Sequence, residues 1–240
     1  MDAETTAPTN PAIAEPTPPS GPAPADPSAG VPFPPPPILE LDRLALRPLH
    51  ARDAPVLARR ANDPGVAGNM SNRFPYPYTE AAAAAWLAGV VARSDHDYAI
   101  CTRENHAELL GVIGIRPHGD VEWRTRELGY WIARECWGKG YMSEAARGFC
   151  RWAFDAIPQM RRIDAGCFGF NAGSARVLAK AGFALEGTRR LCVEKNGVMT
   201  DAKLFGLLRE ECPGVRSATV TGTLEEELAK KEEEEGKKVK

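Results

Sequence analysis

Residues 129–140 read GYWIARECWGKG, and the residues that follow, Tyr141 to Ile157, carry apolar side chains at helical spacing. The first residues of this stretch are typical of a strand, and the rest form a loop that contains Gly138 and Gly140. Glycine lets successive main-chain N–H groups turn toward one point, and the amino end of a helix adds partial positive charge there. This order predicts an anion-binding loop suited to a pyrophosphate.

Two common phosphate loops do not fit this stretch. A Walker A loop requires glycine at position 133 and Ser or Thr at position 140, where the chain has Ala133 and Gly140. A dinucleotide-binding fingerprint belongs to an early β-α-β unit of parallel strands, whereas β-type stretches without an intervening helix precede this loop. Glycines before a helix are a weak signal alone, because tight turns and close helix packing also select them.

Upstream of the loop, the pattern predicts a strand, two helices and a group of strands. The first strand is expected at Leu41–Leu49, Asp53 can cap the first helix, and Thr79 can cap an alanine-rich helix that reaches about Ala92. Three further strands are expected at Tyr98–Arg103, Glu108–Ile115 and Val121–Ile132. Short polar or glycine-containing turns separate them, so they suggest an antiparallel meander.

Downstream of the loop, the helix is expected to bury one face, and a strand, a helix and a strand pair follow. The inward residues of the loop helix are expected to be Met142, Ala145, Ala146, Phe149, Trp152 and Ala153. A strand at Arg162–Phe170 precedes a helix that Asn171 caps and Gly182 ends, with Ala175, Leu178 and Ala179 facing inward. The last strands, Phe183–Glu194 and Thr200–Leu208, flank the turn Asn196-Gly197.

Composition favours one folded domain between two tails. The chain has 240 residues, 43% of them hydrophobic, and a net charge of -2, so it lacks the basic character of a nucleic-acid-binding protein. Residues 1–37 hold most of the 21 prolines and are expected to be a disordered arm, with Pro34–Pro37 acting as a spacer or as an SH3 or WW ligand. The domain is expected at 38–212 and a charged tail at 213–240.

No targeting or membrane signal is expected in this sequence. The amino terminus lacks a basic start followed by an apolar stretch, and no apolar run is long enough to cross a bilayer. The six cysteines form no CxxC pair and no metal-ligand spacing with the four histidines. We therefore expect a cytoplasmic protein with free thiols, without a metal, and without a membrane or nucleic-acid partner.

Three blocks of the sequence together resemble the GNAT acetyltransferases, and specifically their RimJ/RimL-like branch. The blocks are Glu127–Ile132, Trp137–Ala145 and Asn171–Phe183, and the resemblance extends over roughly Leu39 to Leu208. It implies an α/β fold with a mixed, mostly antiparallel twisted sheet and helices on both faces. It also implies acetyl-CoA as the co-substrate and a primary amine as the acceptor.

The resemblance assigns residues to the coenzyme. The diphosphate would be bound by the loop residues Trp137, Gly138, Lys139, Gly140, Tyr141, Met142 and Ser143. Trp131, Ile132 and Ala133 would separate from the neighbouring strand at a bulge and pair their main chain with the pantetheine arm, while Asn171 and Ser174 would lie beside that arm near the thioester.

Two positions depart from the pattern of the family. Position 135, often Gln or Arg in the wider family, is Glu135, which places a carboxylate near the phosphates unless it points to solvent. The tyrosine that many members use as a general acid falls at Leu178. Ser174 is the substitute candidate, donating a hydrogen bond or a proton to the departing thiolate; alternatively, it is an ordinary first-turn helix serine.

Acetyl transfer also needs a base, a donor for the oxyanion and a site for the amine. Glu127 is the best-placed carboxylate to accept the ammonium proton, although a surface or structural role is an equal alternative, and the N–H groups near Ile132 and Ala133 are candidate oxyanion donors. Substrate walls are expected from Asn69, Arg73, Tyr76 and Tyr78, whereas Phe74 is expected to pack in the core.

The expected reaction is direct acetyl transfer from acetyl-CoA to a protein amino-terminal α-amine or a small amine. An α-amine with a pKa near 8 costs only about 1.4 kcal/mol to deprotonate at pH 7, against about 4.6 kcal/mol for lysine, so a site with one modest base suits it. A noncatalytic acyl-CoA-binding module and a scaffold acting through its proline arm are the alternatives. Both a monomer and a homodimer are compatible with the sequence.

Overall fold

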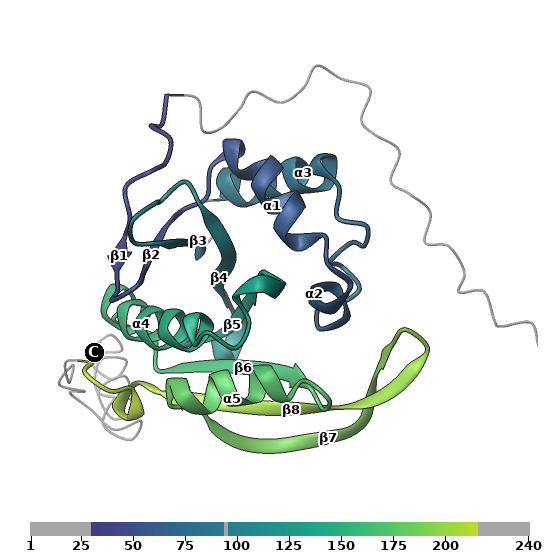
Figure 1. The fold of residues 1–240 in the computed structure, drawn as a ribbon. Coiled ribbons are helices and arrows are strands. Elements are labelled where there is room, and N and C mark those ends of the chain that lie inside the picture. Colours follow the sequence, from purple (N-terminus) through teal and green to yellow (C-terminus); the bar gives the residue numbers. More distant parts are fainter. Residues whose placement is uncertain (1–29, 94–95, 216–240) are drawn as a thin grey trace, which may run out of the picture.

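The computed structural model describes residues 30–93 and 96–215, which form an eight-stranded sheet with helices on both faces (Figure 1). The strands, β1 to β8, are Leu39–Glu40, Leu44–Pro48, His96–Thr102, Leu109–Pro117, Thr125–Ile132, Arg162–Phe168, Ala184–Lys195 and Val198–Leu208. The α-helices, α1 to α5, are Ala54–Ala61, Pro64–Gly68, Glu80–Arg93, Tyr141–Ala156 and Ala172–Ala181. Residues 1–29 and 216–240, which hold most of the predicted arm and tail, lie outside the described residues.

The strand order is β1-β2-β3-β4-β5-β6-β8-β7, and every neighbouring pair is antiparallel except β5 and β6. A parallel pair requires a crossover connection, and α4 provides it between β5 and β6. The predicted meander of β3, β4 and β5 and the predicted α/β fold with a mostly antiparallel sheet are confirmed.

The prediction places the start of one strand wrongly and misses a short helix. The strand expected from Val121 begins only at Thr125, because Asp120 adopts a φ of 54° and starts the 3₁₀ turn Asp120–Glu122. The short helix α2 is absent from the prediction; Pro64 occupies its first turn and the Asp63 side chain accepts the Val66 N–H at 3.0 Å.

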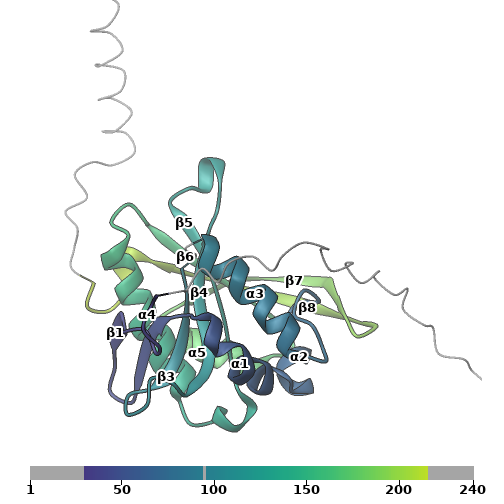
Figure 2. The ribbon, with the colours of Figure 1, turned by 90° about the horizontal axis from the view of Figure 1, so that it is seen from above.

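Two apolar clusters occupy the two faces of the sheet. One packs α4 and α5 against residues such as Leu46 and Ile113, and the other packs α1 and α3 against Ala99 and Val112 (Figures 1 and 2). A strand covered on both faces reads as a continuous apolar run, and β4 is buried from Leu109 to Ile115. All the predicted inward residues of α4 are buried or packed against its cluster.

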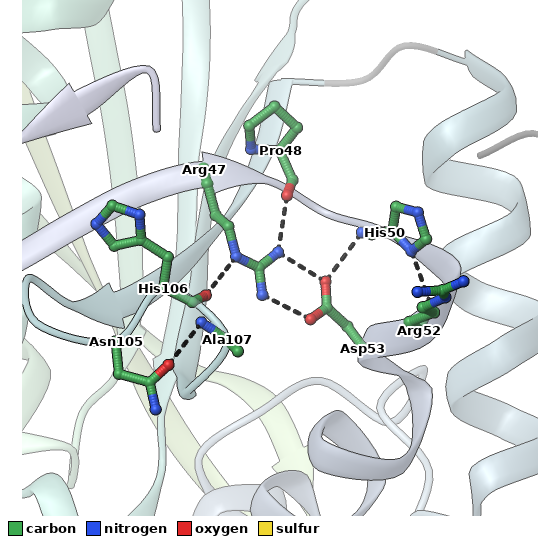
Figure 3. Close-up of polar contacts among 8 residues, drawn as sticks. All are labelled: Arg47, Pro48, His50, Arg52, Asp53, Asn105, His106 and Ala107. Atoms are coloured by element: carbon green, nitrogen blue, oxygen red, sulfur yellow. Dashed lines mark hydrogen bonds and ion pairs between the residues drawn. The ribbon is translucent and has the colours of Figure 1, made fainter. Parts of the chain in front are cut away.

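Asp53 begins the first helix without capping it. No hydrogen bond joins its side chain to the first turn of α1; the carboxylate instead accepts two bonds from the guanidinium of Arg47, at 2.9 and 2.6 Å, and the N–H of His50 (Figure 3). Arg47 also donates to the carbonyl of His106 at 2.6 Å. Arg47 and Asp53 are both fully buried, so this pair joins β2, the first helix and the β3–β4 loop inside the protein.

The other predicted helix and turn signals are confirmed, with one exception. The Thr79 hydroxyl accepts the Ala82 N–H at 3.1 Å, Gly182 ends α5 with a φ of 102°, and Asn196 and Gly197 form the β7–β8 turn at positive φ. Ala179 is exposed rather than inward, whereas Ala181 is buried. Across 30–93 and 96–215, no helix combines the length and apolar character needed to cross a bilayer.

Candidate active site

A cavity of about 680 Å³ lies between β5 and β6 and reaches both faces of the sheet. On one face it is lined by the amino ends of α4 and α5, which contribute Tyr141 and Ser174. On the other face it is lined by Glu127, Trp131 and residues that follow α2, including Asn69. The cavity therefore connects the predicted anion-binding loop with the predicted base.

The cavity exists because β5 and β6 pair over only a short length. Their parallel register joins Thr125 to Arg162 and ends where Glu127 pairs with Asp164. Beyond Glu127, β5 continues to Ile132 beside β4 without a register shift. The predicted separation of the strands is present, but the predicted bulge is wrong: the opening begins where the pairing with β6 stops.

Of the two main-chain N–H groups predicted as oxyanion donors, that of Ala133 does not face this opening. The N–H of Ala133 donates to the carbonyl of Leu110 at 2.8 Å, so it is already bonded to β4 and cannot serve as a free oxyanion donor. In an antiparallel ladder the direction of these groups alternates, which turns those of Tyr130 and Ile132 away from β4 and toward the opening. The Ile132 carbonyl accepts the Trp137 indole N–H at 2.9 Å, leaving the N–H groups of Tyr130 and Ile132 as candidates.

The anion-binding loop has the backbone that its glycines suggest. Gly138 and Gly140 have φ values of 75° and 79°, a region that strongly favours glycine. Gly140 is the amino-terminal cap of α4 and provides no side-chain oxygen for the first amides of the helix. Those amides, from Tyr141 to Ser143, border the cavity, where an anion can accept their hydrogen bonds.

Arg43 fastens this loop to the rest of the sheet. Its guanidinium donates to the Lys139 carbonyl at 3.0 Å and to Glu144 at 2.7 Å, and it lies 4.8 Å from the centre of the Tyr141 ring. The Arg43 main-chain N–H donates to the same Glu144 carboxylate at 2.8 Å. Glu144 is almost fully buried, so the first turn of α4 and the glycine loop are held by a charged pair that sequence reasoning missed.

Glu135 does not face the cavity. Its carboxylate pairs with Arg60 of α1, and Arg60 also contacts Glu108 at 3.2 Å. Lys139, at the tip of the loop, is exposed and is not part of the cavity wall. The negative charge at position 135 is therefore neutralised beside the loop and does not approach the predicted phosphate position.

Only Asn69 of the four predicted substrate residues borders the cavity. Its side chain donates to the Gly65 carbonyl at 2.8 Å, which fixes it at the end of α2. Tyr78 is buried, with burial raising the pKa of its phenol to about 12, and its ring lies 4.8 Å from that of Phe74. Tyr78 is therefore a core residue, and Phe74 packs as predicted. Arg73 and the exposed Tyr76 lie outside the cavity wall.

Met70 and Ser71, which the sequence did not single out, line the cavity beside Asn69, and Phe168 and Val193 face it from β6 and β7. The β7–β8 hairpin reaches this side of the molecule, where Lys195 donates to Asn72 at 3.1 Å (Figure 1). The side of the cavity that holds Glu127 thus combines apolar side chains with one carboxylate.

Two hydroxyl groups meet on the α5 side of the cavity. The Asn171 side chain caps α5 by accepting the Ser174 N–H at 2.9 Å, and the Ser174 hydroxyl lies 2.8 Å from the phenol of Tyr130. Leu178 is fully buried, and because its side chain is apolar it places no polar group in the cavity. The phenol at this side of the cavity comes from Tyr130 of β5 instead. Alternation along β5 could have indicated that Tyr130 and Trp131 face opposite sides, but not that Tyr130 meets Ser174.

Comparisons with known proteins agree with this geometry. A family model described as an acetyltransferase (GNAT) domain matches residues 43–184. The uncharacterized N-acetyltransferase p20 of Bacillus licheniformis is 29% identical over 181 residues, which cover 73% of this chain and 98% of the relative. The uncharacterized N-acetyltransferase YoaA of Bacillus subtilis is 30% identical over 187 residues, covering 72% and 97%. The solved structure of Mycobacterium smegmatis RimJ in complex with CoA-disulfide is 26% identical, has a TM-score of 0.62 and covers 72% of this chain and 85% of that one.

Proposed function

The chain belongs to the GNAT acetyltransferase family and is an acetyl-CoA-dependent N-acetyltransferase, and from this membership we propose that it acetylates a primary α-amine, either the amino terminus of a protein or that of a small molecule. The observation that carries the proposal is the cavity that joins the amino end of α4 to Glu127 through the opening between β5 and β6. It provides separate places for a phosphate-bearing donor and an amine.

The described residues fit acetyl-CoA. The N–H groups from Tyr141 to Ser143 would bind the diphosphate, and the open edge of β5 would pair with the amide-containing arm. The thioester would then lie near Ser174, and the N–H groups of Tyr130 and Ile132 would stabilise the oxyanion. Asn171 would support this arrangement by fixing Ser174 at the start of α5.

Glu127 supports the choice of an α-amine. It lines the cavity from the strand end where β5 and β6 diverge, with Arg116 of β4 and Asp164 of β6 as its neighbours in register. Those three side chains share one face of the sheet, since directly paired residues point the same way. One carboxylate is a modest base, and an α-amine needs only about 1.4 kcal/mol to lose its proton at pH 7, against about 4.6 kcal/mol for a lysine.

The test is a competition among acceptors. The full chain is incubated with acetyl-CoA and a mixture of peptides with free or blocked amino termini, free amino acids and small amines, and mass spectrometry identifies the products while thiol release gives the rate. We expect acetyl groups on α-amines, with blocked peptides that contain lysine unmodified. Acetylation of lysine side chains alone would contradict the proposed acceptor.

Glu127→Gln tests the base. We expect it to lower kcat by about 100-fold near neutral pH. The rate should recover in part as the pH approaches the pKa of the free amine. Glu122→Gln, which changes an exposed carboxylate outside the cavity, is the matched control and should keep wild-type rates. Equal rates for Glu127→Gln and wild type would remove Glu127 from the mechanism.

A further inference from the structure

The contact between Tyr130 and Ser174 lies inside the cavity and involves no residue of the anion-binding loop. The phenol oxygen is 2.8 Å from the Ser174 Oγ and 3.4 Å from the Ser174 carbonyl. Tyr130 comes from the open length of β5, and Ser174 comes from the first turn of α5. The pair therefore crosses the opening at the side where the thioester of the proposed donor would lie.

The direction of the hydrogen bond determines what Ser174 can do. A phenol and a serine hydroxyl each have one proton to donate. If Ser174 donates to Tyr130, its proton is used within the pair. If Tyr130 donates to Ser174, the serine keeps its proton for a third group. The Ser174 carbonyl, 3.4 Å from the phenol oxygen, can only accept, so the phenol proton is directed toward Ser174. Burial raises the pKa of Tyr130 and keeps that proton on the phenol.

A cysteine thiol lines the cavity together with Ser174 and indicates which form of sulfur this side favours. Burial raises the pKa of Cys167, while the charge of Lys203 and a hydrogen bond from Ser174 act in the opposite direction. A donor hydroxyl at Ser174 therefore favours a sulfur anion at this side of the cavity.

We propose that Tyr130 is a positioning residue for acetyl transfer: its phenol donates to the Ser174 Oγ and thereby directs the serine proton toward the sulfur of the leaving coenzyme A. This inference rests on the proposed function and adds a residue to it. In the step concerned, the amine nitrogen bonds to the acetyl carbon, and the carbon–sulfur bond breaks with its electron pair on sulfur. The proton that this nitrogen must lose to become an amide passes to Glu127. Ser174 donates a hydrogen bond to the thiolate, and Tyr130 retains its proton.

Removing only the phenol oxygen tests this role. We expect Tyr130→Phe to lower kcat about tenfold while the KM for acetyl-CoA stays unchanged, because the lost hydrogen bond acts on the leaving group. Ser174→Ala should lower kcat at least as much. The double variant should be no slower than Ser174→Ala, since the phenol acts through the serine. Independent, multiplying losses would overturn the proposal, as would a Tyr130→Phe variant with the wild-type kcat.

A second measurement requires no acceptor. The ultraviolet absorbance of the thiolate reports the pKa of the thiol of bound coenzyme A, and a directed hydrogen bond from Ser174 should hold that pKa below its value in free coenzyme A. We expect both Tyr130→Phe and Ser174→Ala to raise it. Tyr98→Phe, which removes a phenol that packs against Phe149 and Trp152 outside the cavity wall, should leave it unchanged.

The two measurements separate the failure of this inference from the failure of the proposed function. If the wild-type protein acetylates no α-amine but its bound thiol titrates low and Tyr130→Phe raises the pKa, the acceptor is wrong and the positioning role stands. If transfer occurs and Tyr130→Phe changes neither the pKa nor kcat, the positioning role is wrong. Circular dichroism and melting of each variant verify that the fold is retained.

Discussion

Arg60 neutralises a carboxylate that lies close to the anion-binding loop. The Glu135 side chain is half exposed, whereas the Arg60 side chain is only 16% exposed, so the arginine is the fixed partner of the pair. Arg60 also contacts Glu108, which leaves it between two carboxylates. A negative charge beside a phosphate site weakens anion binding unless a cation offsets it. We therefore expect Arg60 to support coenzyme binding without touching the cavity.

Substituting Arg60→Ala should raise the dissociation constant for coenzyme A about three- to tenfold, because the Glu135 charge is then unopposed. Calorimetry at low and at high salt measures this effect, which should shrink as salt screens the charge. Adding Glu135→Gln to Arg60→Ala should restore binding. If the double variant binds as weakly as Arg60→Ala, the loss comes from packing and the electrostatic account is wrong.

Single residues were predictable where local sequence fixes their place. Asn171 followed from a helix-cap pattern and Glu127 from its position on a strand, whereas Ser174 was assigned through the family resemblance; all three line the cavity. Tyr78 was misplaced because an aromatic residue in a loop looks the same in sequence whether it faces solvent or a helix. Tyr130 was missed because its partner is 44 residues away, and only the tertiary fold brings the two together.

At the scale of elements, α4 holds its position through Arg43 as well as through its apolar face. Glu144 receives both the main-chain N–H and the guanidinium of Arg43, and Arg43 reaches back to the Lys139 carbonyl. Glu144 is in the first turn of α4, where a negative charge also favours the helix dipole. One buried carboxylate thus connects the β1–β2 turn, the glycine loop and the helix start.

We expect Glu144→Ala to lower the free energy of unfolding by about 2 kcal/mol, because two hydrogen bonds to a charged group are lost. The same change should weaken coenzyme A binding, since the glycine loop loses its anchor. Urea unfolding and calorimetry measure the two effects. Arg147→Ala, an exposed change one turn further along α4, is the control and should alter neither. A stable Glu144→Ala protein with reduced affinity would separate the two roles.

Helix caps, turns and apolar spacing gave most elements, because those signals lie within a few residues of one another. The opening between β5 and β6 is different. It arises where the hydrogen-bonded pairing between these two strands ends, and α4 separates the strands in sequence. The sequence near the opening therefore did not indicate it, and the expected bulge is wrong. Short α2 was missed because its five residues carry too little periodicity.

For the whole molecule, the core on each face of the sheet contains groups that must stay neutral. Burial raises the pKa of the Cys101 thiol from 9.0 to about 11, although Arg47 acts against it, and burial raises the pKa of Cys212 to about 11 as well. The fully buried pair of Arg47 and Asp53 (Figure 3) lies beside Cys101, and composition and periodicity did not reveal it.

Stability should therefore fall in alkali. A thiol whose pKa is higher in the folded state contributes stability that is complete below its unfolded pKa and is lost as the pH rises through its folded pKa. For Cys101 that window runs from 9.0 to about 11, and the loss is on the order of 2 kcal/mol. Urea unfolding in reducing buffer across this range should show it. Cys101→Ala should flatten the slope, and Cys192→Ala, which changes an exposed thiol, should not.

The sheet has a seam, because β5 and β6 share only the pairs from Thr125–Arg162 to Glu127–Asp164. Five strands lie on one side of that seam and three on the other. A compound that spans the seam contacts both parts of the sheet where the two strands share no main-chain hydrogen bonds. Ligands that bind only the native state raise the melting temperature. Thermal-shift screening of small-molecule collections should thus detect molecules that fill the seam among those that bind the native state, giving a route to inhibitors before any acceptor is known.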